Sequence, residues 1–246
     1  MSAPAPASAP ASEPAPGLTL RGVTAPLRLV DFGLIAFDMD STLINIECID
    51  EIADTAGRKA EVAAITEAAM RGEITDYKES LRRRVALLAG VPVEALEQVW
   101  RQRLQLNPGA ETLVRACQAA GLRTLLVSGG FTFFTDRVRD RLGLDFARSN
   151  VLDVAAGRLT GRMVAQPWGD ICDGEEKRRM LLDTCARLGL SPEQAIAVGD
   201  GANDLPMMAV AGLSVAYHAK PRVREQAMVA IDSGGLDRLL DLFRAP

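Results

Sequence analysis

The sequence has almost no histidine and few cysteines, and this scarcity argues against a zinc site. Its 246 residues include one histidine, His218, and four cysteines that form no C-x-x-C pair. A structural zinc ion usually needs four closely spaced cysteine and histidine ligands. We therefore expect the cysteines to be buried free thiols of a protein in a reducing, cytoplasmic compartment. They are Cys48, Cys117, Cys172 and Cys185.

Long apolar runs and an excess of positive charge are absent as well. No apolar run approaches the roughly 18–20 residues that span a bilayer, and the formal net charge is -4. We therefore expect neither a nucleic-acid nor a membrane partner. The first sixteen residues are almost wholly Ala, Pro and Ser, without the basic and apolar regions of a secretory signal. We expect residues 1–18 to form a disordered tail, and the sequence leaves the oligomeric state open.

Short apolar runs of strand length begin after the first 28 residues and alternate with helical patterns. This alternation is typical of βαβ units, whose right-handed crossovers give a parallel sheet covered on both faces. The 48% hydrophobic content is enough for a substantial core. We therefore predict an α/β fold with a Rossmann-like, doubly wound parallel sheet. The predicted strands are 34–37, 124–127, 195–198, 213–216 and 228–231.

The stretch between the first two predicted strands is far longer than one crossover helix needs. Four of its segments carry apolar residues at three- and four-residue spacing and are separated by glycines. We expect residues 46–105 to be an inserted helical-bundle cap, with residues 28–45 and 106–246 forming the core domain. Residues 150–166 alternate around a turn and predict a β-hairpin. The predicted cap helices are 46–56, 59–70, 77–88 and 93–104.

Two carboxylates follow the first predicted strand. Asp38 and Asp40 stand two positions apart at the end of the apolar run, and Thr42 comes next in the same pattern. Side chains at i and i+2 of a strand share a face, and the carboxyl edge of a parallel sheet is the usual ligand crevice. One carboxylate could attack phosphorus while the other transfers protons. Taken alone, such a pair is also typical of a helix cap or a solvated turn.

Three later clusters add to this pair. An S-G-G turn at residues 128–130 follows the second strand, where exposed backbone N–H groups can bind an anion. Lys177 stands near the start of a predicted helix, where a cation is unfavourable unless an anion lies nearby. Asp200 and Asp204 lie in a glycine turn after the third strand and supply the oxygen ligands that Mg²⁺ prefers. The alternatives, for each cluster alone, are an ordinary glycine turn, a surface lysine and a solvated acidic turn.

The order of these clusters resembles the haloacid dehalogenase (HAD) superfamily of phosphohydrolases. The pattern is D-x-D-x-T, then S-G, then K, then G-D-x-x-x-D, and the resemblance covers residues 30–244. The segments DMDSTLINIECIDEIA, SGGF and VGDGAND are similar to those of members that hydrolyse O-phospho-L-serine, the last step of serine biosynthesis. The resemblance therefore implies the HAD fold, a small-molecule substrate and Mg²⁺ as the cofactor.

The resemblance also implies a role for each matching residue. Asp38 would be the nucleophile that becomes an aspartyl phosphate, and Asp40 would serve as acid for the leaving oxygen and then as base for water. Mg²⁺ would be held by Asp38, the backbone carbonyl of Asp40 and Asp200, while Asp204 orients these ligands. Thr42 would support the first loop. The phosphoryl group and the substrate would be bound by Ser128, the Gly129 amide, Lys177 and Asn203.

Charge explains why such residues are needed. A phosphate dianion repels a carboxylate nucleophile, so Mg²⁺ and Lys177 have to supply positive charge. Close carboxylates disfavour simultaneous ionisation and raise the pKa of one of them. We therefore expect Asp40 to be neutral beside Asp38.

Substrate selection is expected in the cap. Phosphoserine carries an ammonium and a carboxylate, and the resemblance assigns these to Glu47 and Arg84, with Met70 as an apolar wall. Without the resemblance, Glu47 is a first-turn helix acid, Arg84 is part of a basic surface and Met70 is a core residue. Just before Arg84 the chain is one residue longer than the superfamily pattern and has Tyr77 where phenylalanine is usual. Arg82 is therefore an alternative to Arg84, although the two cannot face the same way on a helix.

Two other functions share some of these features. A phosphotransferase, or a phosphatase for another small phosphomonoester, would use the same fold and the same aspartyl phosphate. A receiver-like signalling module also combines an aspartyl phosphate, acidic metal ligands and a lysine. Such a module needs neither the proton-transferring Asp40 nor a helical cap, so a Mg²⁺-dependent hydrolase is the expected function.

Overall fold

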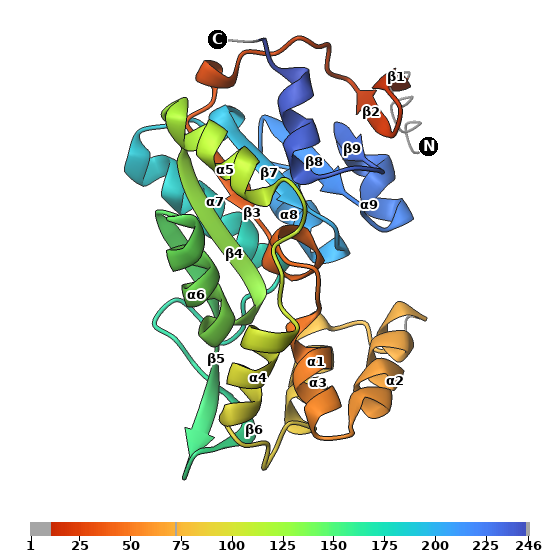
Figure 1. Cartoon of the computed structure of the whole chain (residues 1–246), viewed down its shortest axis with the longest axis vertical. Coiled ribbons are helices and arrows are strands. Elements are labelled where there is room, and N and C mark those ends of the chain that lie inside the picture. Colours follow the sequence, from red (N-terminus) through yellow and green to blue (C-terminus); the bar gives the residue numbers. More distant parts are fainter. Residues whose placement is uncertain (1–10, 72, 245–246) are drawn as a thin grey trace, which may run out of the picture.

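The computed structural model describes residues 11–71 and 73–244, which form one large sheet flanked by helices (Figure 1). Its strands are β1 (Ala11–Ala15), β2 (Leu18–Arg21), β3 (Leu34–Phe37), β4 (Arg123–Phe131), β5 (Phe146–Ala155), β6 (Arg158–Val164), β7 (Ala195–Gly199), β8 (Leu213–Tyr217) and β9 (Val229–Ile231). Within the described residues they pair in the order β1-β2-β9-β8-β7-β3-β4-β5-β6. The pairs from β9 to β5 are parallel, and β1, β2 and β6 join as antiparallel strands. The predicted α/β fold is confirmed.

Helices cover both faces of this sheet. Those of the core are α5 (Ala110–Ala119), α6 (Thr132–Leu142), α7 (Gly174–Leu188), α8 (Leu205–Met208) and α9 (Pro221–Gln226). All four residues of β3 are buried, and they alternate between two apolar clusters. Ile35 and Phe37 share a cluster with residues of α5 and α6, whereas Leu34 and Ala36 share one with residues of α7, α8 and α9. A continuous apolar run such as β3 is therefore a central strand of a doubly wound sheet.

Four helices stand between β3 and β4, in the lower part of Figure 1. They are α1 (Cys48–Thr55), α2 (Lys59–Met70), α3 (Tyr77–Ala86) and α4 (Glu94–Gln102). Each coincides with a predicted cap helix to within about two residues. In α1, α3 and α4 the buried residues form one apolar stripe that packs inward. The assignment of residues 46–105 as a separate cap domain stays a prediction.

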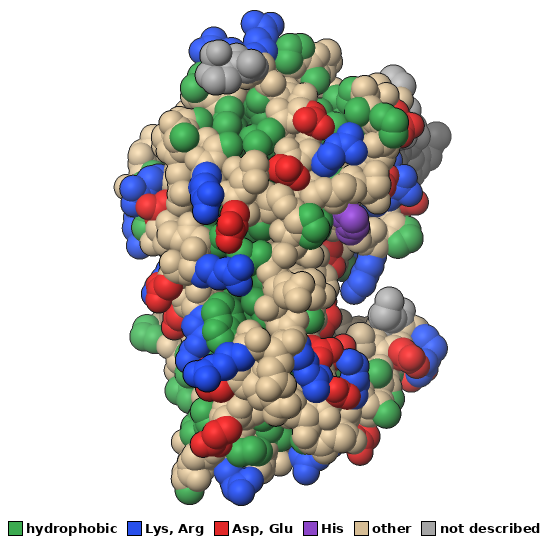
Figure 2. All heavy atoms as spheres, viewed as in Figure 1, with side chains coloured by type: hydrophobic (Ala, Val, Ile, Leu, Met, Phe, Trp, Pro, Cys, Tyr) green, Lys and Arg blue, Asp and Glu red, His purple; other side chains and the backbone are tan. Residues whose placement is uncertain are grey.

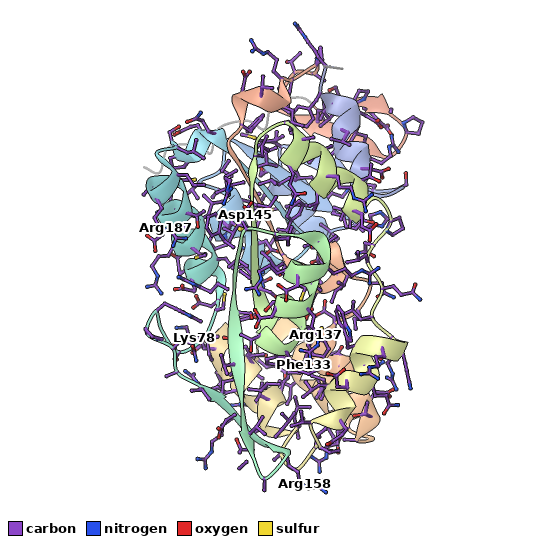
Figure 3. All side chains as sticks on the ribbon, turned by 60° about the vertical axis from the view of Figure 1, so that its left-hand side comes forward. Lys78, Phe133, Arg137, Asp145, Arg158 and Arg187 are labelled. Carbon is purple, nitrogen blue, oxygen red and sulfur yellow. The ribbon has the colours of Figure 1, made fainter. Side chains whose placement is uncertain are left out.

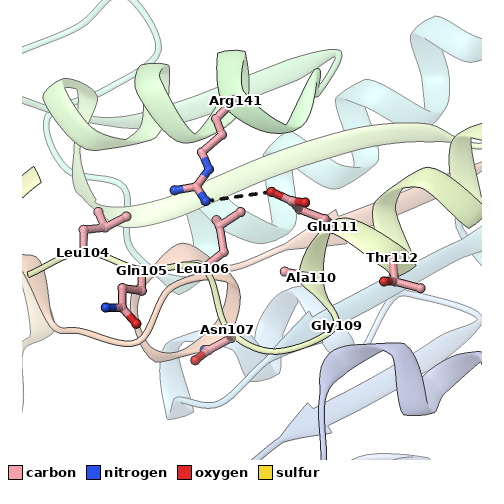
Figure 4. Close-up of a pocket in the computed structure, with 9 residues that line it drawn as sticks. All are labelled: Leu104, Gln105, Leu106, Asn107, Gly109, Ala110, Glu111, Thr112 and Arg141. Atoms are coloured by element: carbon pink, nitrogen blue, oxygen red, sulfur yellow. Dashed lines mark ion pairs between the residues drawn. The ribbon is translucent and has the colours of Figure 1, made fainter. Parts of the chain in front are cut away.

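A narrow neck connects these helices to the sheet. The N–H of Asn45 donates to the carbonyl of Gln105 at 3.0 Å, and the N–H of Gln105 donates to Oδ1 of Asn45 at 2.8 Å. The returning segment, residues 104–107, borders a cavity of about 470 Å³ beside the Glu111–Arg141 ion pair, which measures 3.8 Å (Figure 4). The two chain segments of the neck are thus bonded to each other, where the boundaries of the cap were expected.

The predicted β-hairpin is present as β5 and β6, with Ala156 and Gly157 in the left-handed turn. Its antiparallel pairs lie within the predicted residues 150–166, and β5 begins earlier because its first residues pair in parallel with β4. Its far end, where Figure 3 labels Arg158, contacts the loop between α3 and α4. The Leu159 carbonyl accepts from the N–H of Gly90, and the Leu159 N–H donates to the Val91 carbonyl, both at 2.8 Å. The cap helices are therefore attached to the core at the hairpin as well as at the neck.

The amino-terminal segment differs from the disordered tail expected over residues 1–18. Residues 1–10 lie outside the described residues, but β1 pairs with β2, and β2 pairs with β9 at the edge of the sheet. Leu18 and Leu20 are only 1% and 3% exposed. The Ala- and Pro-rich composition gives no strand pattern by itself. The neighbouring edge strand supplies the backbone partners that order the segment.

Two further expectations concern the whole chain. The four cysteines are free and buried, as predicted. Over residues 11–71 and 73–244, none of the helices combines the length and the apolar character needed to cross a membrane.

Candidate active site

A cavity of about 810 Å³ lies between the carboxyl ends of the central strands and the cap helices. In Figure 2 the surface is indented on the right-hand side, where the upper and lower parts of the molecule meet. Most of the residues predicted from the sequence line this cavity, although they come from segments far apart in the chain. They are Asp38, Asp40, Glu47, Arg84, Ser128, Gly129, Asp200 and Asn203.

The turn after β3 presents the two carboxylates of the D-x-D pattern. The Asp38 N–H donates to the Val198 carbonyl at 2.9 Å, which continues the pairing of β3 with β7. Oδ1 of Asp38 accepts from the N–H of Met39 at 2.7 Å. Oδ2 of Asp40 accepts from the N–H of Cys48 at 3.2 Å, whereas Oδ1 of Asp40 is buried without a hydrogen-bond partner among the described residues. Asp40 therefore has one oxygen available for a proton or a substrate group.

Lys177 is fully buried beneath this turn. It lies in the first turns of α7, and its Nζ is 2.7 Å from Oδ1 of Asp38 and 2.7 Å from Oδ1 of Asp204. The sequence placed a cation near a helix start that would need a neighbouring anion. The structure supplies two such anions, Asp38 and Asp204, so Lys177 connects the loop after β3 to the loop after β7.

Three carboxylates form a group that can hold a divalent cation. Ligand oxygens of Asp38, Asp200 and Asp204 lie within 4.8 Å of one another. Both oxygens of Asp204 already accept hydrogen bonds: Oδ1 from Lys177, and Oδ2 from the N–H groups of Asp200 (3.1 Å) and Gly201 (2.9 Å). In contrast, Oδ2 of Asp38 and Oδ2 of Asp200 have no hydrogen-bond partner in the described part of the chain. Hard oxygen donors of this kind fit a hard cation.

Thr42 belongs to the same group. It is fully buried, and its hydroxyl donates to Oδ1 of Asp200 at 3.1 Å. This bond orients Asp200 and leaves its Oδ2 as the oxygen available to a ligand. The predicted supporting role of Thr42 thus has a specific partner, on a segment 158 residues away in the sequence.

Burial and neighbouring carboxylates raise the pKa of the acidic residues at this site. Burial, followed by the charges of Asp204 and Asp200, raises the pKa of Asp38 despite the opposing effect of Lys177. Burial and then Glu47 raise the pKa of Asp40 to about 8. Burial and then Asp204 raise the pKa of Asp200 to about 7. The protonated form of Asp40 is therefore favoured near neutral pH.

The turn after β4 carries the S-G-G segment. Ser128 is 1% exposed, and its Oγ accepts from the N–H of Gly130 at 2.9 Å. The Tyr77 hydroxyl packs so closely over Gly129 that a β-carbon at this position would overlap it. The lack of a side chain at Gly129 thus leaves room for the Tyr77 hydroxyl of α3 beside this turn.

The cap contributes residues of both charges to the cavity. Glu47 lies at the start of α1, and its Oε1 accepts from the Ser41 hydroxyl at 2.7 Å. Arg84 of α3 lines the cavity, whereas Arg82 lies outside its lining and pairs with Asp170. Of the two candidates for the predicted basic residue, Arg84 is therefore the one that faces the cavity. The side chain of Met70 lies outside the described residues.

Three residues at this site were not predicted from the sequence. Lys220 and Arg222, at the start of α9, line the cavity and add positive charge beside the acidic group. Asn150 on β5 is 1% exposed and donates to the Gly129 carbonyl. In the sequence these residues belong to no recognisable motif, because only the folded chain brings them near residues 128–130 and 200–204.

Known proteins have the same fold and closely related sequences. Residues 32–212 match the family described as haloacid dehalogenase-like hydrolase. The chain is 75% identical over 233 residues to a phosphoserine phosphatase of Polaromonas sp., which covers 95% of this chain and 99% of the relative. It is 73% identical over 230 residues to the phosphoserine phosphatase of Albidiferax ferrireducens, covering 94% and 97%. A solved structure described as a phospho-aspartyl intermediate analogue of phosphoserine phosphatase matches with a TM-score of 0.79 at 38% identity, covering 87% of this chain and 99% of the other. This chain therefore belongs to the haloacid dehalogenase-like hydrolases.

Proposed function

We propose that this chain is a Mg²⁺-dependent phosphatase that hydrolyses O-phospho-L-serine to L-serine and phosphate through an aspartyl phosphate. The observation that carries the proposal is the arrangement around Asp38, which faces the cavity beside the buried cation of Lys177 and the acid Asp40. The phosphoserine phosphatases that are 75% and 73% identical over nearly the whole chain support the substrate. The four free, buried thiols are consistent with work in a reducing cytoplasm.

In the first step, a free oxygen of Asp38 attacks phosphorus and the bond to the serine oxygen breaks. Lys177 holds the other oxygen of Asp38 at 2.7 Å, so the nucleophile is oriented and part of the negative charge is neutralised. Asp40 donates its proton to the leaving serine oxygen, which departs as a neutral hydroxyl. The Ser128 hydroxyl and the backbone at Gly129 bind the phosphoryl oxygens.

In the second step, Asp40 has become a carboxylate and acts as the base. It removes a proton from water, which attacks the phosphorus of the aspartyl phosphate and regenerates the carboxylate of Asp38. Mg²⁺, held by Asp38, the Asp40 carbonyl and Asp200, would neutralise negative charge on the phosphoryl oxygens. Asp204 orients this loop through the N–H groups of Asp200 and Gly201.

Charge in the cap supports an amino acid as the leaving group. Glu47 offers a carboxylate for the substrate ammonium, and the Ser41 hydroxyl holds it in place. Arg84 offers a guanidinium for the substrate carboxylate, while Asn203 contributes an amide from the metal loop. Met70 is proposed as an apolar wall. A neutral sugar or glycerol phosphate would leave Glu47 and Arg84 without oppositely charged partners from the substrate, at a cost in binding.

The test is phosphate release from L-phosphoserine beside phosphothreonine, glycerol phosphate and a sugar phosphate, each with Mg²⁺ and with EDTA. We expect a strong preference for phosphoserine that EDTA abolishes. A purified Asp38→Asn variant provides the control, since it should fold and lack turnover. Full activity of that variant would contradict the covalent mechanism. Preference for another substrate would retain the chemistry and reject the roles of Glu47 and Arg84, and transfer to an added alcohol would indicate a phosphotransferase.

A further inference from the structure

Asn150 on β5 uses both ends of its side-chain amide inside the protein. It is 1% exposed; Nδ2 donates to the Gly129 carbonyl at 2.8 Å, and Oδ1 accepts from the N–H of Cys172 at 2.8 Å. Because a carbonyl can only accept and an N–H can only donate, these two partners fix the orientation of the amide. One side chain therefore connects the S-G-G turn after β4 with the segment that leads into α7.

The first of these bonds replaces a missing part of the sheet. β4 and β5 pair regularly as far as Val127, and the register then shifts before Phe131 pairs with Asn150. Such a bulge leaves backbone groups without ladder partners, and buried backbone groups need a substitute. The amide of Asn150 supplies this substitute for the Gly129 carbonyl, at the point where the turn leaves the ladder.

The bond to Gly129 also determines how Ser128 is presented. The Gly129 carbonyl and the Gly130 N–H belong to one planar peptide unit, and that N–H donates to Oγ of Ser128 at 2.9 Å. A bond that fixes the orientation of the Gly129 carbonyl therefore also fixes the direction of the Gly130 N–H. Since Oγ of Ser128 already accepts a hydrogen bond, its own hydrogen is available to a phosphoryl oxygen in the cavity that Ser128 lines. Successive hydrogen bonds of this kind also polarise one another.

The second bond of Asn150 acts on the helix that carries the buried cation. Cys172 directly precedes Asp173, whose Oδ1 accepts from the N–H of Glu176 at 2.9 Å and caps α7. The Asp173 carbonyl accepts from the N–H of Lys177 at 2.9 Å. The position of the segment at Cys172 therefore sets where the first turn of α7, and with it Lys177, meets the cavity.

We propose that Asn150 is a positioning residue that fixes Ser128 relative to Lys177 and thereby sets the affinity of the site for a phosphoryl group. The inference rests on the proposed function, in which these two residues bind and neutralise that group. An amide is required, because one end has to donate and the other has to accept. Aspartate would keep the acceptor for Cys172 and place an oxygen against the Gly129 carbonyl. Alanine would remove both bonds without adding charge.

The test compares Asn150→Asp and Asn150→Ala with the wild-type chain. The measurements are the Ki of inorganic phosphate, the KM and kcat for L-phosphoserine, and the Tm with and without phosphate. We expect both variants to raise Ki and to lower kcat/KM by about tenfold or more, as for a buried hydrogen bond whose partner is left unsatisfied. Asn150→Ala keeps the test valid if Asn150→Asp fails to fold.

The matched control is Ser149→Ala, one residue earlier on β5. Neighbouring residues of a strand point to opposite faces, and Ser149 is buried in a 2.7 Å hydrogen bond with Thr135. We expect this variant to lower Tm and to leave the phosphate Ki unchanged. If the folded Asn150 variants also lose only stability and keep the wild-type Ki, the proposal is wrong.

A double variant tests whether Asn150 acts on phosphate binding through Ser128. If Asn150 acts by presenting Ser128, the losses of Ser128→Ala and Asn150→Asp will not add when the two are combined. Fully additive losses would show that Asn150 does not act through Ser128. Absence of phosphoserine turnover in the wild-type chain would instead overturn the proposed function. The phosphate-dependent Tm shift would still decide whether Asn150 sets phosphate affinity.

Discussion

Nζ of Lys177 lies 2.7 Å from Oδ1 of Asp38 and equally close to Oδ1 of Asp204, and none of these side chains is more than 8% exposed. Burial alone would lower the pKa of Lys177, but the two carboxylates raise it well above its ordinary value. The ammonium therefore stays charged inside the protein. One cation thus holds the proposed nucleophile and, through Asp204, the loop that presents the remaining carboxylates.

We expect Lys177→Met to affect stability and catalysis together. Removing one partner of a buried ion pair leaves uncompensated charge and costs about 3–5 kcal/mol, while losing an electrostatic contact to the reacting group lowers kcat/KM by about 10²–10³-fold. Urea unfolding and phosphoserine turnover measure the two effects. The control is Lys78→Met, because the Lys78–Asp170 pair is 34% and 47% exposed and should contribute less than about 1 kcal/mol. Unchanged turnover in Lys177→Met would contradict the proposed role.

Glu47→Gln is expected to weaken selection for the amino acid portion of the substrate. The variant keeps the shape and removes the charge that would bind the ammonium, so KM for phosphoserine should rise about tenfold or more. Turnover of glycerol phosphate, which has no ammonium, should change less, because there the variant acts only through a lower pKa of Asp40. The control is Glu51→Gln on the same helix, whose carboxylate pairs with Lys59 and Arg103. Equal effects of Glu47→Gln on both substrates would reject this assignment.

Arg84 and Arg82 provide a second matched pair on α3. Arg84 lines the cavity, and Arg82 pairs with the exposed Asp170. Arg84→Ala should raise KM for phosphoserine about tenfold or more through loss of a charged hydrogen bond, whereas Arg82→Ala should leave KM nearly unchanged. Steady-state kinetics of the two variants decide which arginine binds the substrate carboxylate. The reverse result would place the substrate carboxylate at Arg82.

Mg²⁺ should stabilise the chain more at pH 8 than at pH 5.5. The pKa of Asp40 is raised to about 8 and that of Asp200 to about 7, in both cases mainly by burial. The metal-free folded chain therefore holds protons that the unfolded chain releases, and its stability falls as the pH rises from about 4 to about 8. Mg²⁺ would bind the ionised carboxylate of Asp200, so its stabilising effect grows as Asp200 loses its proton.

The measurement is the Tm shift on adding MgCl₂ at the two pH values. Asp200→Asn is the control, since it removes one titrating ligand and should reduce the shift at pH 8. An equal shift of the wild-type chain at both pH values would show that Mg²⁺ binds away from this group.

Local pattern predicted the elements whose burial is continuous or periodic. The run Leu34–Phe37 is buried on both faces, so its apolar composition alone marks a central strand. The helices of the cap were predicted at nearly the observed positions, and α1, α3 and α4 each bury one apolar stripe. β1 was missed because an Ala- and Pro-rich segment has no strand pattern, and its order comes from pairing with β2. Such pairing depends on how the whole chain folds, so the residues of β1 alone do not predict it.

The same distinction between local pattern and tertiary contact explains which site residues were predicted from the sequence. Asp38, Asp40, Asp200 and Asp204 stand in compact motifs directly after strands, so their spacing indicated a shared edge of the sheet. Asn150 stands alone in a strand, and its two partners are 21 and 22 residues away. No local spacing identifies such a residue, because its function depends on the bulge that β4 forms opposite it.

Gly129→Ala should impair phosphoserine binding because the new methyl group would overlap Tyr77 of the cap helix α3. Removal of the Tyr77 hydroxyl oxygen should partly reverse the effect. A β-carbon at residue 129 would overlap the Tyr77 hydroxyl, while the next atom of that side chain, Cζ, would lie 3.3 Å away. Overpacking of this kind costs about 1–3 kcal/mol, so the Tyr77 side chain, or α3 with it, would have to move away from the S-G-G turn. We expect KM for phosphoserine to rise about tenfold.

Tyr77→Phe removes the overlapping oxygen and retains the ring. In the Gly129→Ala background it should therefore recover much of the lost affinity, whereas in the wild-type background it should change KM only slightly. Kinetics of the two single variants and the double variant form a cycle that isolates the contact between residues 77 and 129. If Tyr77→Phe gives no recovery, the cost of Gly129→Ala does not come from the contact with α3, and it would have to arise within the phosphate-binding turn itself.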